Sequence, residues 1–341
     1  MSLMREETLS SADCADAFLA QGMASALRCG AQLRERGVRH LEVLGRGSSS
    51  HAGTLLRYAL AEQGGLGVSA AMPSLAANAQ ALSHLRGNAL VAISQSGKSP
   101  DLVRYASAAR AAGAYVLALT NTGGSALGAG ADVDIALGAG PERAVAATKS
   151  VILSMFAGLG MAAGYHDDDA LRQALTGMPA RLREAACCDW SALGALLVQA
   201  RAVYVLGRGA DLGVAKEIAL KISEAVGVPA LAFSSAEFMH GPLGAVSAQT
   251  PVLGIAARPG DFSSVGSAFE HARAMGAPTL LAHGQSTQAV AADLALPAAQ
   301  GTLADCLLAL VPAYLAIEAA ALRAGRNPDQ PRGLSKVTET L

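Results

Sequence analysis

The chain of 341 residues repeats one pattern of segments at a constant distance along the sequence. The pentapeptide Val43-Leu44-Gly45-Arg46-Gly47 returns 162 residues later as Val205-Leu206-Gly207-Arg208-Gly209. Two further segments, around Ile93 and after Gly113, recur at this offset to within one residue. An alanine-rich chain gives isolated chance matches, but three segments that keep one offset predict two copies of the same domain.

Each copy alternates short apolar runs with segments of helical periodicity, which is typical of a parallel sheet covered on both faces. The sequence therefore predicts the α/β class, with two tandem doubly wound parallel-sheet domains of the flavodoxin-like three-layer type. We expect the first domain over residues 1–165 and the second over residues 166–341. In the first copy, strands are expected at 41–44, 67–71, 89–93, 114–120 and 133–137, and helices at 16–37, 51–62, 75–82 and 102–113. Two further helices, at 144–164 and 170–186, are expected to lead out of this copy. Both ends, residues 1–15 and 327–340, have the composition of loose segments.

The composition argues against several classes of protein. The net charge is −1 and no basic run is present, so neither nucleic acid nor an anionic membrane surface is an expected partner. No apolar stretch of transmembrane length stands clear of charge, and no secretory signal opens the chain, which favours a cytoplasmic location. The five cysteines lack a C-x-x-C pair and the seven histidines are scattered. We therefore expect no disulfide framework, no metal site and no cofactor.

The stretch Ser94–Asp101 joins an apolar strand to a helix and is rich in hydroxyl groups. A helix start offers free backbone N–H groups to an anion. Ser94, Ser96 and Ser99 add hydroxyl donors, Gln95 can bond a sugar hydroxyl, and a glycine allows close approach of the backbone. The alternative is a serine-capped turn without a ligand. The second copy has Ala256–Gly260 here, without hydroxyls, so only the first copy is expected to bind an anion.

Ionisable residues of the second copy are candidates for the chemistry. Lys221 and Glu224 are three residues apart, which places them on one face of a helix, although an ordinary surface ion pair has the same spacing. His240 precedes Gly-Pro at a chain break and can titrate near neutral pH, or it can be a loop histidine bonded to its own backbone. Lys336, next to Ser335, would by default be a solvated tail lysine.

Five motifs in order resemble the tandem sugar-isomerase (SIS) domain family over nearly the whole chain. Within that family the sequence resembles the type II glucosamine-6-phosphate deaminases and the isomerase half of glucosamine-6-phosphate synthase. The motifs are Gly45–Ser49, Ser94–Ser99, Val145–Lys149, Ser234–Leu243 and Asp329–Lys336.

The resemblance implies a role for each matching residue. It implies that a sugar phosphate is held by Ser49, Ser94, Gln95, Ser96 and Ser99, with Ser48 and Val145 along the sugar. Glu224 corresponds to the base that moves a proton between C1 and C2. His240 corresponds to the histidine that opens the sugar ring and, in the family, comes from the other subunit of a homodimer. Lys221 and Lys336 correspond to lysines near the sugar carbonyl, and Ser335 is a candidate substrate contact.

These roles imply a cofactor-independent enzyme that converts glucosamine 6-phosphate to fructose 6-phosphate and ammonia. Cys14 lies in a helical context and gives no N-terminal nucleophile for glutamine, which favours the direction that releases ammonia. The nearest enzymatic alternative is isomerisation or deglycation of another amino-sugar phosphate. A regulatory protein that senses a sugar phosphate is the alternative from another class, but residues 1–40 leave little room for a DNA-binding domain.

Overall fold

The computed structural model describes residues 1–258, 260, 262–284 and 293–336. The chain folds into two compact units. The first unit contains residues 13–142 and 149–176, and the second contains residues 1–12, 143–148 and 177–336. Each unit is built around one five-stranded sheet in which every strand pair is parallel.

The sheet of the first unit has the strand order β2-β1-β3-β4-β5. Its strands are β1 (His40–Leu44), β2 (Gly67–Ala70), β3 (Ala89–Ser94), β4 (Tyr115–Thr120) and β5 (Val133–Ala136). The central strand β3 is buried along its whole length, as expected for an apolar strand covered on both faces.

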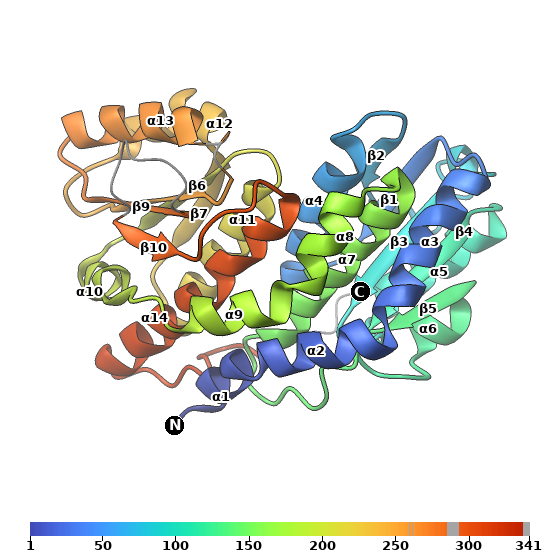
Figure 1. Ribbon diagram of the computed structural model, residues 1–341, viewed down its shortest axis with the longest axis horizontal. Helices are drawn as coiled ribbons and strands as arrows, with labels where there is room; N and C mark the ends of the chain where they lie inside the picture. The colour runs from blue at the N-terminus through green and yellow to red at the C-terminus, as the bar shows by residue number, and fades with distance from the viewer. Residues whose placement is uncertain (259, 261, 285–292, 337–341) are drawn as a thin grey trace. The chain divides into compact units, whose positions relative to one another are not determined.

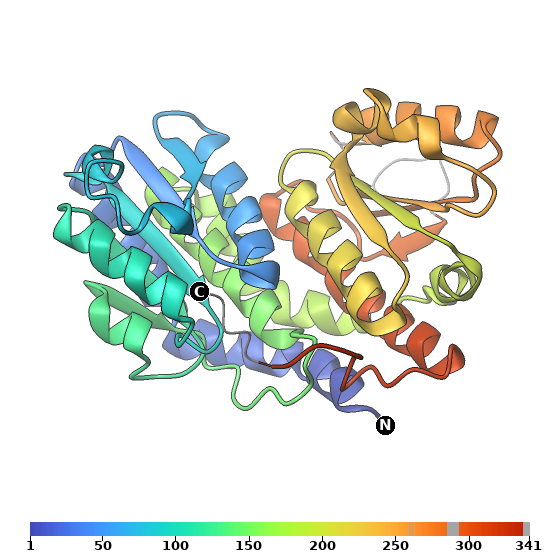
Figure 2. The ribbon, with the colours of Figure 1, turned by 180° about the vertical axis from the view of Figure 1, so that it is seen from behind.

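Helices cover both faces of this sheet (Figures 1 and 2). One face carries α3 (Met23–Glu35), α4 (Gly47–Ala61) and α7 (Lys149–His166), and the other carries α5 (Pro100–Ala111) and α6 (Ala126–Gly130). The remaining elements of the unit are α2 (Ser11–Gln21), α8 (Asp169–Thr176) and the short 3₁₀ turns η1 (Pro73–Leu75) and η2 (Ser83–Leu85).

The second unit repeats this plan. Its strands are β6 (Val203–Gly207), β7 (Ala230–Ser234), β8 (Val252–Ala256), β9 (Thr279–Gly284) and β10 (Leu294–Leu296), in the order β7-β6-β8-β9-β10. Helices α12 (Ser235–Met239) and α13 (Phe262–Ala274) lie on one side of the sheet, and α10 (Ser191–Gln199), α11 (Asp211–Lys221) and α14 (Leu310–Arg323) lie on the other (Figure 1). The unit also contains α1 (Leu3–Leu9), α9 (Met178–Ala186), the π-helical turn η3 (Ile222–Val226), and the 3₁₀ segments η4 (Pro242–Ala245) and η6 (Leu303–Ala309). The matching strand orders confirm the predicted pair of doubly wound domains.

The repeated glycines have a structural reason. A Cβ atom built on Gly45 would lie 2.8 Å from the backbone carbon of Ser49, and one built on Gly207 would lie 2.6 Å from that of Asp211. Real side-chain carbons essentially never come this close, so both turns require glycine where the strand passes into its helix. The pentapeptide repeat is therefore a packing requirement of the same turn in both sheets.

Several predicted local structures were wrong. Residues 1–15 are not a loose arm, because α1 and α2 occupy most of them and Asp329 accepts hydrogen bonds from the backbone N–H groups of Leu3 and Met4. The single helix expected over 16–37 is divided at Gly22, and the helix expected over 170–186 is divided between α8 and α9. The helix expected over 75–82 is absent, since this described segment holds only 3₁₀ turns at its margins. The tail is ordered up to Lys336, and the rest of the predicted frayed end lies outside the described residues.

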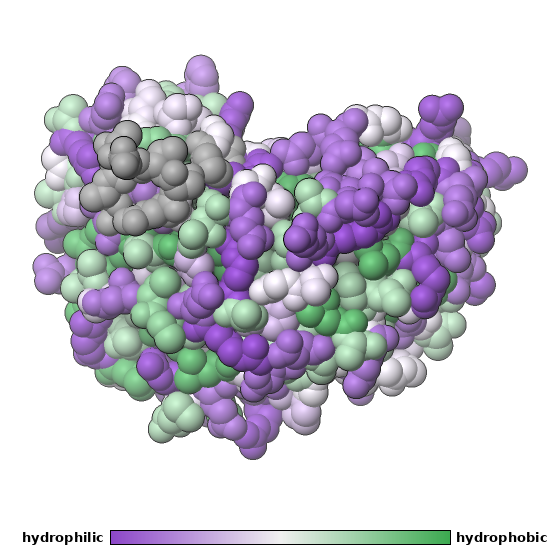
Figure 3. Space-filling view, viewed as in Figure 1, coloured by the Kyte–Doolittle hydropathy of each residue, from purple (hydrophilic) through white to green (hydrophobic). Residues whose placement is uncertain are grey.

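One stretch in the described part of the chain, Leu303–Arg323, is long and apolar enough to cross a membrane by length and composition. Within its most apolar window, 83% is buried inside the protein, which is also what a core helix shows. On the face shown in Figure 3, hydrophilic residues interrupt the hydrophobic patches of both units.

Candidate active site

Two turns meet at the carboxyl edge of the first sheet. Strands β1 and β3 are neighbours and run parallel, so the turn after Leu44 and the turn after Ser94 lie at the same edge. In a sheet of this strand order the chain leaves these two strands in opposite directions, and ligands bind in the crevice between them. Ser48 and Ser49, in the first turn of α4, therefore lie at the same edge as the serine-rich turn Ser94–Ser99.

The hydroxyl groups of the serine turn organise its backbone. Ser94 Oγ accepts a hydrogen bond from the N–H of Gly97 at 3.1 Å, and Ser96 Oγ accepts one from the N–H of Lys98 at 3.3 Å. Each hydroxyl keeps its own proton and can donate it to an anion. Ser99 occupies the N-cap position of α5 but makes no side-chain capping bond in the described structure. A serine-capped turn without a ligand would have such a bond at this position.

Gly97 fixes the shape of this turn. Its φ angle is 62°, in the left-handed region, and a Cβ atom at this position would lie 2.2 Å from Ser125 Oγ. The carbonyl of Gly97 accepts a hydrogen bond from the N–H of Leu127 at 3.0 Å. The turn is thus held against the start of α6 by a contact that excludes any side chain.

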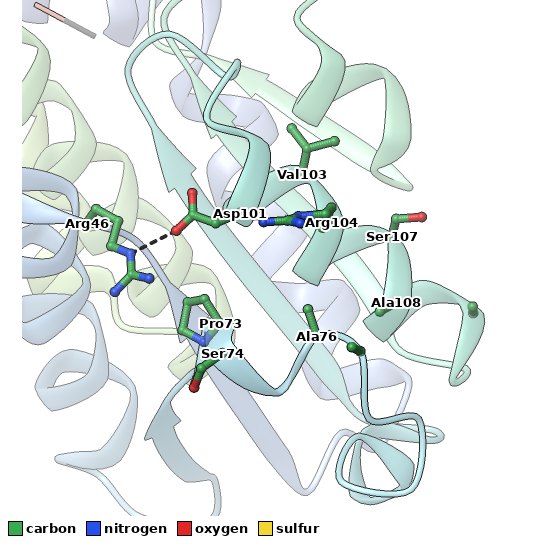
Figure 4. A pocket seen from close by; sticks show the side chains of 11 residues that line it. Arg46, Pro73, Ser74, Ala76, Asp101, Val103, Arg104, Ser107 and Ala108 are labelled. Carbon is green, nitrogen blue, oxygen red and sulfur yellow. Dashed lines mark hydrogen bonds and ion pairs between the residues drawn. The ribbon is translucent and has the colours of Figure 1, made fainter. Parts of the chain in front are cut away.

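A cavity of about 780 Å³ lies beside these turns, between η1 and α5 (Figure 4). At its wall, Arg46 Nε donates to Asp101 Oδ2 at 3.0 Å, which joins the turn after β1 to the first turn of α5. Asp101 is buried, and its other oxygen has no hydrogen-bond partner among the described residues. The lining consists of Arg46, Pro73, Ser74, Ala76, Ala77, Asp101, Val103, Arg104, Ser107, Ala108 and Ala111.

The second copy contains a carboxylate at the corresponding place. The repeat offset pairs Asp211 with Ser49, and it pairs Ala257, after β8, with Gln95. Asp211 is fully buried, and its Oδ2 accepts a hydrogen bond from the N–H of Ala257 at 3.0 Å. A protein carboxylate thus bonds the turn where the first copy presents serine hydroxyls, which favours anion binding by the first copy alone.

Lys221 and Glu224 come together where α11 ends. The helix passes into the π-helical turn η3, which closes at Gly227 in the left-handed conformation. Lys221 Nζ forms a hydrogen-bonded ion pair with Glu224 Oε2, and the Lys221 side chain is 1% exposed while that of Glu224 is 20% exposed. A buried ammonium beside a carboxylate that reaches water differs from the surface ion pair that the spacing alone would allow. π-Helical turns of this kind are frequent at functional sites.

A second carboxylate at this place was missed by the sequence reasoning. Glu217, one helical turn before Lys221, is fully buried and its Oε1 lies 3.4 Å from Lys221 Nζ. Tyr314 on α14 donates its hydroxyl to Glu217 Oε1 at 3.2 Å. Burial by itself lowers the pKa of Lys221, but Glu217 and Glu224 together hold it above the ordinary lysine value. The i, i+4 spacing of Glu217 and Lys221 is visible in the sequence and could have identified this second ion pair.

Glu224 precedes strand β7, whereas His240 follows the helix that comes after this strand. The neighbour of Glu224, Ser223, accepts a hydrogen bond from the N–H of Ala230, where β7 begins. His240 is exposed and follows α12, which starts directly after β7 ends at Ser234. Five residues of strand span roughly 13 Å at about 3.3 Å per step. In chain order, strand β7 and helix α12 therefore separate these two predicted residues.

Lys336 and Val145 belong to one hydrogen-bonded patch of the second unit. Lys336 Nζ donates to the carbonyl of Ala144 at 2.7 Å, and the N–H of Val145 donates to the carbonyl of Asp329 at 3.0 Å. The side chain of Asp329 in turn binds the start of α1. Lys336 is therefore held on the segment that carries Val145, while Ser335 beside it is exposed.

The two parallel sheets, each with two turns that meet at its carboxyl edge, define a doubled fold of the sugar-isomerase type. A model of the SIS domain family matches residues 36–163 and 196–323, and the chain belongs to this family. This confirms the family resemblance predicted from the five motifs.

Known relatives place the chain within the family. It is 31% identical over 313 residues to the isomerizing glutamine–fructose-6-phosphate aminotransferase of Pyrobaculum aerophilum, covering 87% of this chain and 51% of that protein. The corresponding aminotransferase of Corynebacterium efficiens is 35% identical over 266 residues, covering 72% and 42%. The chain thus spans about half the length of the curated relatives that it matches.

Solved structures show the same fold. A Silicibacter pomeroyi protein, provisionally described as a phosphosugar isomerase, superposes with a TM-score of 0.87 at 34% identity, covering 96% of this chain and 100% of that one. The glucosamine-6-phosphate deaminase of Thermotoga maritima superposes with a TM-score of 0.77 at 17% identity, covering 99% and 100%. At that identity the second likeness bears on the fold alone.

Proposed function

We propose that this protein is a cofactor-independent phosphosugar isomerase that converts glucosamine 6-phosphate and water to fructose 6-phosphate and ammonia. Membership of the SIS family and the names of its relatives support a sugar phosphate as substrate. The observation that carries the proposal is the pairing of the part-exposed Glu224 with the buried ammonium of Lys221 in a π-helical turn. This arrangement provides a base next to a fixed positive charge.

In the proposed reaction the serine hydroxyls hold the phosphate of the open-chain sugar, and Glu224 has the role of the base that the family resemblance implies. The serine hydroxyls anchor the phosphate, so binding energy remote from the reaction positions C1 and C2. Glu224 takes the proton from C2 and returns it to C1, which turns the aldehyde into an alcohol and the C2 amine into an imine. Water then hydrolyses the imine to the ketone and releases ammonia. Lys336 stabilises negative charge that develops on the carbonyl oxygen, and the buried Lys221 holds Glu224 in place.

We further propose that the active site is shared between two copies of the chain. Glu224 precedes β7 and His240 follows the helix after it, and His240 is exposed. A twofold dimer lets the His240 of each subunit serve the Glu224 of the other, where it passes the proton that opens the sugar ring.

A Glu224→Gln substitution tests the proposed base. The amide keeps the shape of the side chain but cannot accept the C2 proton, so turnover should fall by at least about a hundredfold. Fructose 6-phosphate and ammonia are both assayed after addition of glucosamine 6-phosphate, and C2 deuterium exchange is followed in heavy water. Binding of the sugar phosphate, measured by calorimetry, should be retained because the anchoring serines lie in the first unit.

Glu184→Gln, at an exposed position on α9, is the matched control and should behave as the wild-type protein. If Glu224→Gln exchanged the C2 hydrogen at the wild-type rate, the base would be another group. If the wild-type protein formed fructose 6-phosphate from no amino-sugar phosphate at all, the proposed activity would be wrong.

A further inference from the structure

A cluster of metal-binding side chains lies at the amino end of β1, away from the serine turns. His40 and Glu42 alternate along the strand and so face the same side of the sheet, and His84 comes from η2. One potential ligand atom from each of these residues lies within 4.8 Å of the other two. Zinc bonds of about 2.1 Å in a tetrahedral site place ligand atoms about 3.4 Å apart, so a small shift of the exposed His84 suffices.

The hydrogen bonds of His84 leave one ring nitrogen directed at Glu42. Its Nδ1 lies 2.9 Å from the carbonyl oxygen of Ala81, which can only accept, so Nδ1 carries the proton. Its Nε2 lies 2.8 Å from Glu42 Oε1. With the proton on Nδ1, the lone pair of Nε2 points toward this carboxylate oxygen, so both atoms face the place where a cation can bind.

Glu42 is prepared to offer a single oxygen. Its other oxygen, Oε2, accepts a hydrogen bond from the Tyr105 hydroxyl at 2.5 Å, and both residues are buried. A carboxylate fixed in this way by an outer hydrogen bond is typical of metal sites.

The backbones that carry the two histidines are tied together by one side chain. Asn88 Nδ2 donates to the carbonyl of His84 at 2.8 Å, and Asn88 Oδ1 accepts from the N–H of His40 at 2.9 Å. The ring of His40 is further oriented by Ser69 Oγ, 3.0 Å from its Nε2. The cluster is therefore held in place before any ion binds, which favours affinity.

We propose that His40, Glu42 and His84 bind a divalent transition-metal ion of the zinc type, with water completing its coordination. Two imidazoles and a carboxylate are a donor set that zinc favours. Along β1, Glu42 lies roughly 10 Å and His40 roughly 17 Å from Gly45 at about 3.3 Å per residue, so the site is separate from the proposed catalytic edge. Its effect is to fasten the irregular segment 71–88, which also lines the cavity, to the sheet.

The test is metal binding by the full chain, expressed without a histidine tag and treated with a chelator. Cobalt(II) is titrated while its visible absorption is followed, and bound Zn²⁺ is counted after dialysis. The wild-type protein should take up one ion per chain and unfold at a higher temperature when Zn²⁺ is bound. His84→Gln should bind at least about a hundredfold more weakly, since loss of an outer partner alone costs about 10- to 100-fold.

His271→Gln is the matched control, because His271 also bonds a carbonyl through Nδ1, that of Ser267 at 2.9 Å, but has no place in the cluster. It should bind like the wild-type protein. Tyr105→Phe should weaken binding about 10- to 100-fold without abolishing it. A wild-type protein that takes up no ion would show that a protonated His84 paired with Glu42 accounts for the contact. Binding that His84→Gln leaves unchanged, or a spectrum with thiolate bands, would overturn the assignment as well.

Discussion

Replacing Lys221 by methionine should strongly destabilise the second unit. The substitution keeps the apolar stem but removes an ammonium that is 1% exposed and lies between Glu217 and Glu224. Removing one partner of a buried ion pair costs about 3–5 kcal/mol, because the other charge remains in the interior. Glu224 is 20% exposed and can turn to water, whereas Glu217 is fully buried, so we expect a loss of about 3 kcal/mol.

The loss is measured by urea denaturation at pH 7.5, followed by circular dichroism. Because the pKa of Lys221 is raised, its stabilising contribution is complete below the unfolded lysine value of about 10.4 and is lost only as the pH rises through the folded value. Titration of this lysine should therefore not change the difference in unfolding free energy between the wild type and Lys221→Met near neutral pH. Lys216→Met, at a partly buried position on the same helix, is the control and should cost no more than about 1 kcal/mol.

The double variant Lys221→Met/Glu217→Leu tests whether Lys221 compensates the buried charge of Glu217. Removing both buried charges should recover most of the lost stability, because an apolar pair of similar volume replaces an ion pair at little cost. A single variant as stable as the wild type, or a double variant as unstable as the single one, would refute the view that Lys221 compensates a buried Glu217.

Two further outcomes are expected. Mixing inactive His240→Ala and Glu224→Ala chains should restore about a quarter of wild-type activity, because half of the dimers are mixed and each mixed dimer has one intact site of two. Activity that never rises above that of the separate variants would exclude a shared site. Gly97→Ala should lower the free energy of unfolding by at least about 1 kcal/mol and weaken binding of inorganic phosphate, because of the φ of 62° and the contact with Ser125. Gly130→Ala, with open space at its Cβ position, is the control and should do neither. Equal phosphate binding by both variants would contradict the role of the turn.

The sequence predicted the architecture better than the local boundaries. The doubled sheet could be found because Gly45 and Gly207 are required by the same steric contact, which leaves a repeat in the sequence. The segment 75–82 was mistaken for a helix because its apolar spacing fits one. In the structure Leu82 is buried with Leu85 in the core next to α5, without a regular helix between them and η1.

Partners distant in sequence account for the other misses. The tail was expected to fray by composition, yet the carboxylate of Asp329 binds the N–H groups at the start of α1, more than 320 residues away. His40 and His84 are 44 residues apart and lie near each other only through the fold, so their grouping with Glu42 was not visible in the sequence. The Lys221–Glu224 pair could be predicted from its spacing, but the hydrogen bond between Tyr314 of α14 and the buried Glu217 depends on the fold and could not.

The carboxylate of Asp211 makes the two copies differ in how they respond to their surroundings. In the second copy the Asp211 carboxylate is part of the chain and binds the turn after β8, so the order of this turn does not depend on a bound solute. A phosphate that binds the first copy at a hundred times its dissociation constant would add about 2.7 kcal/mol to the stability of that copy alone. With the proposed phosphate site, the order of the serine turn in the first copy would follow the phosphate concentration, whereas the order of the corresponding turn in the second copy would not.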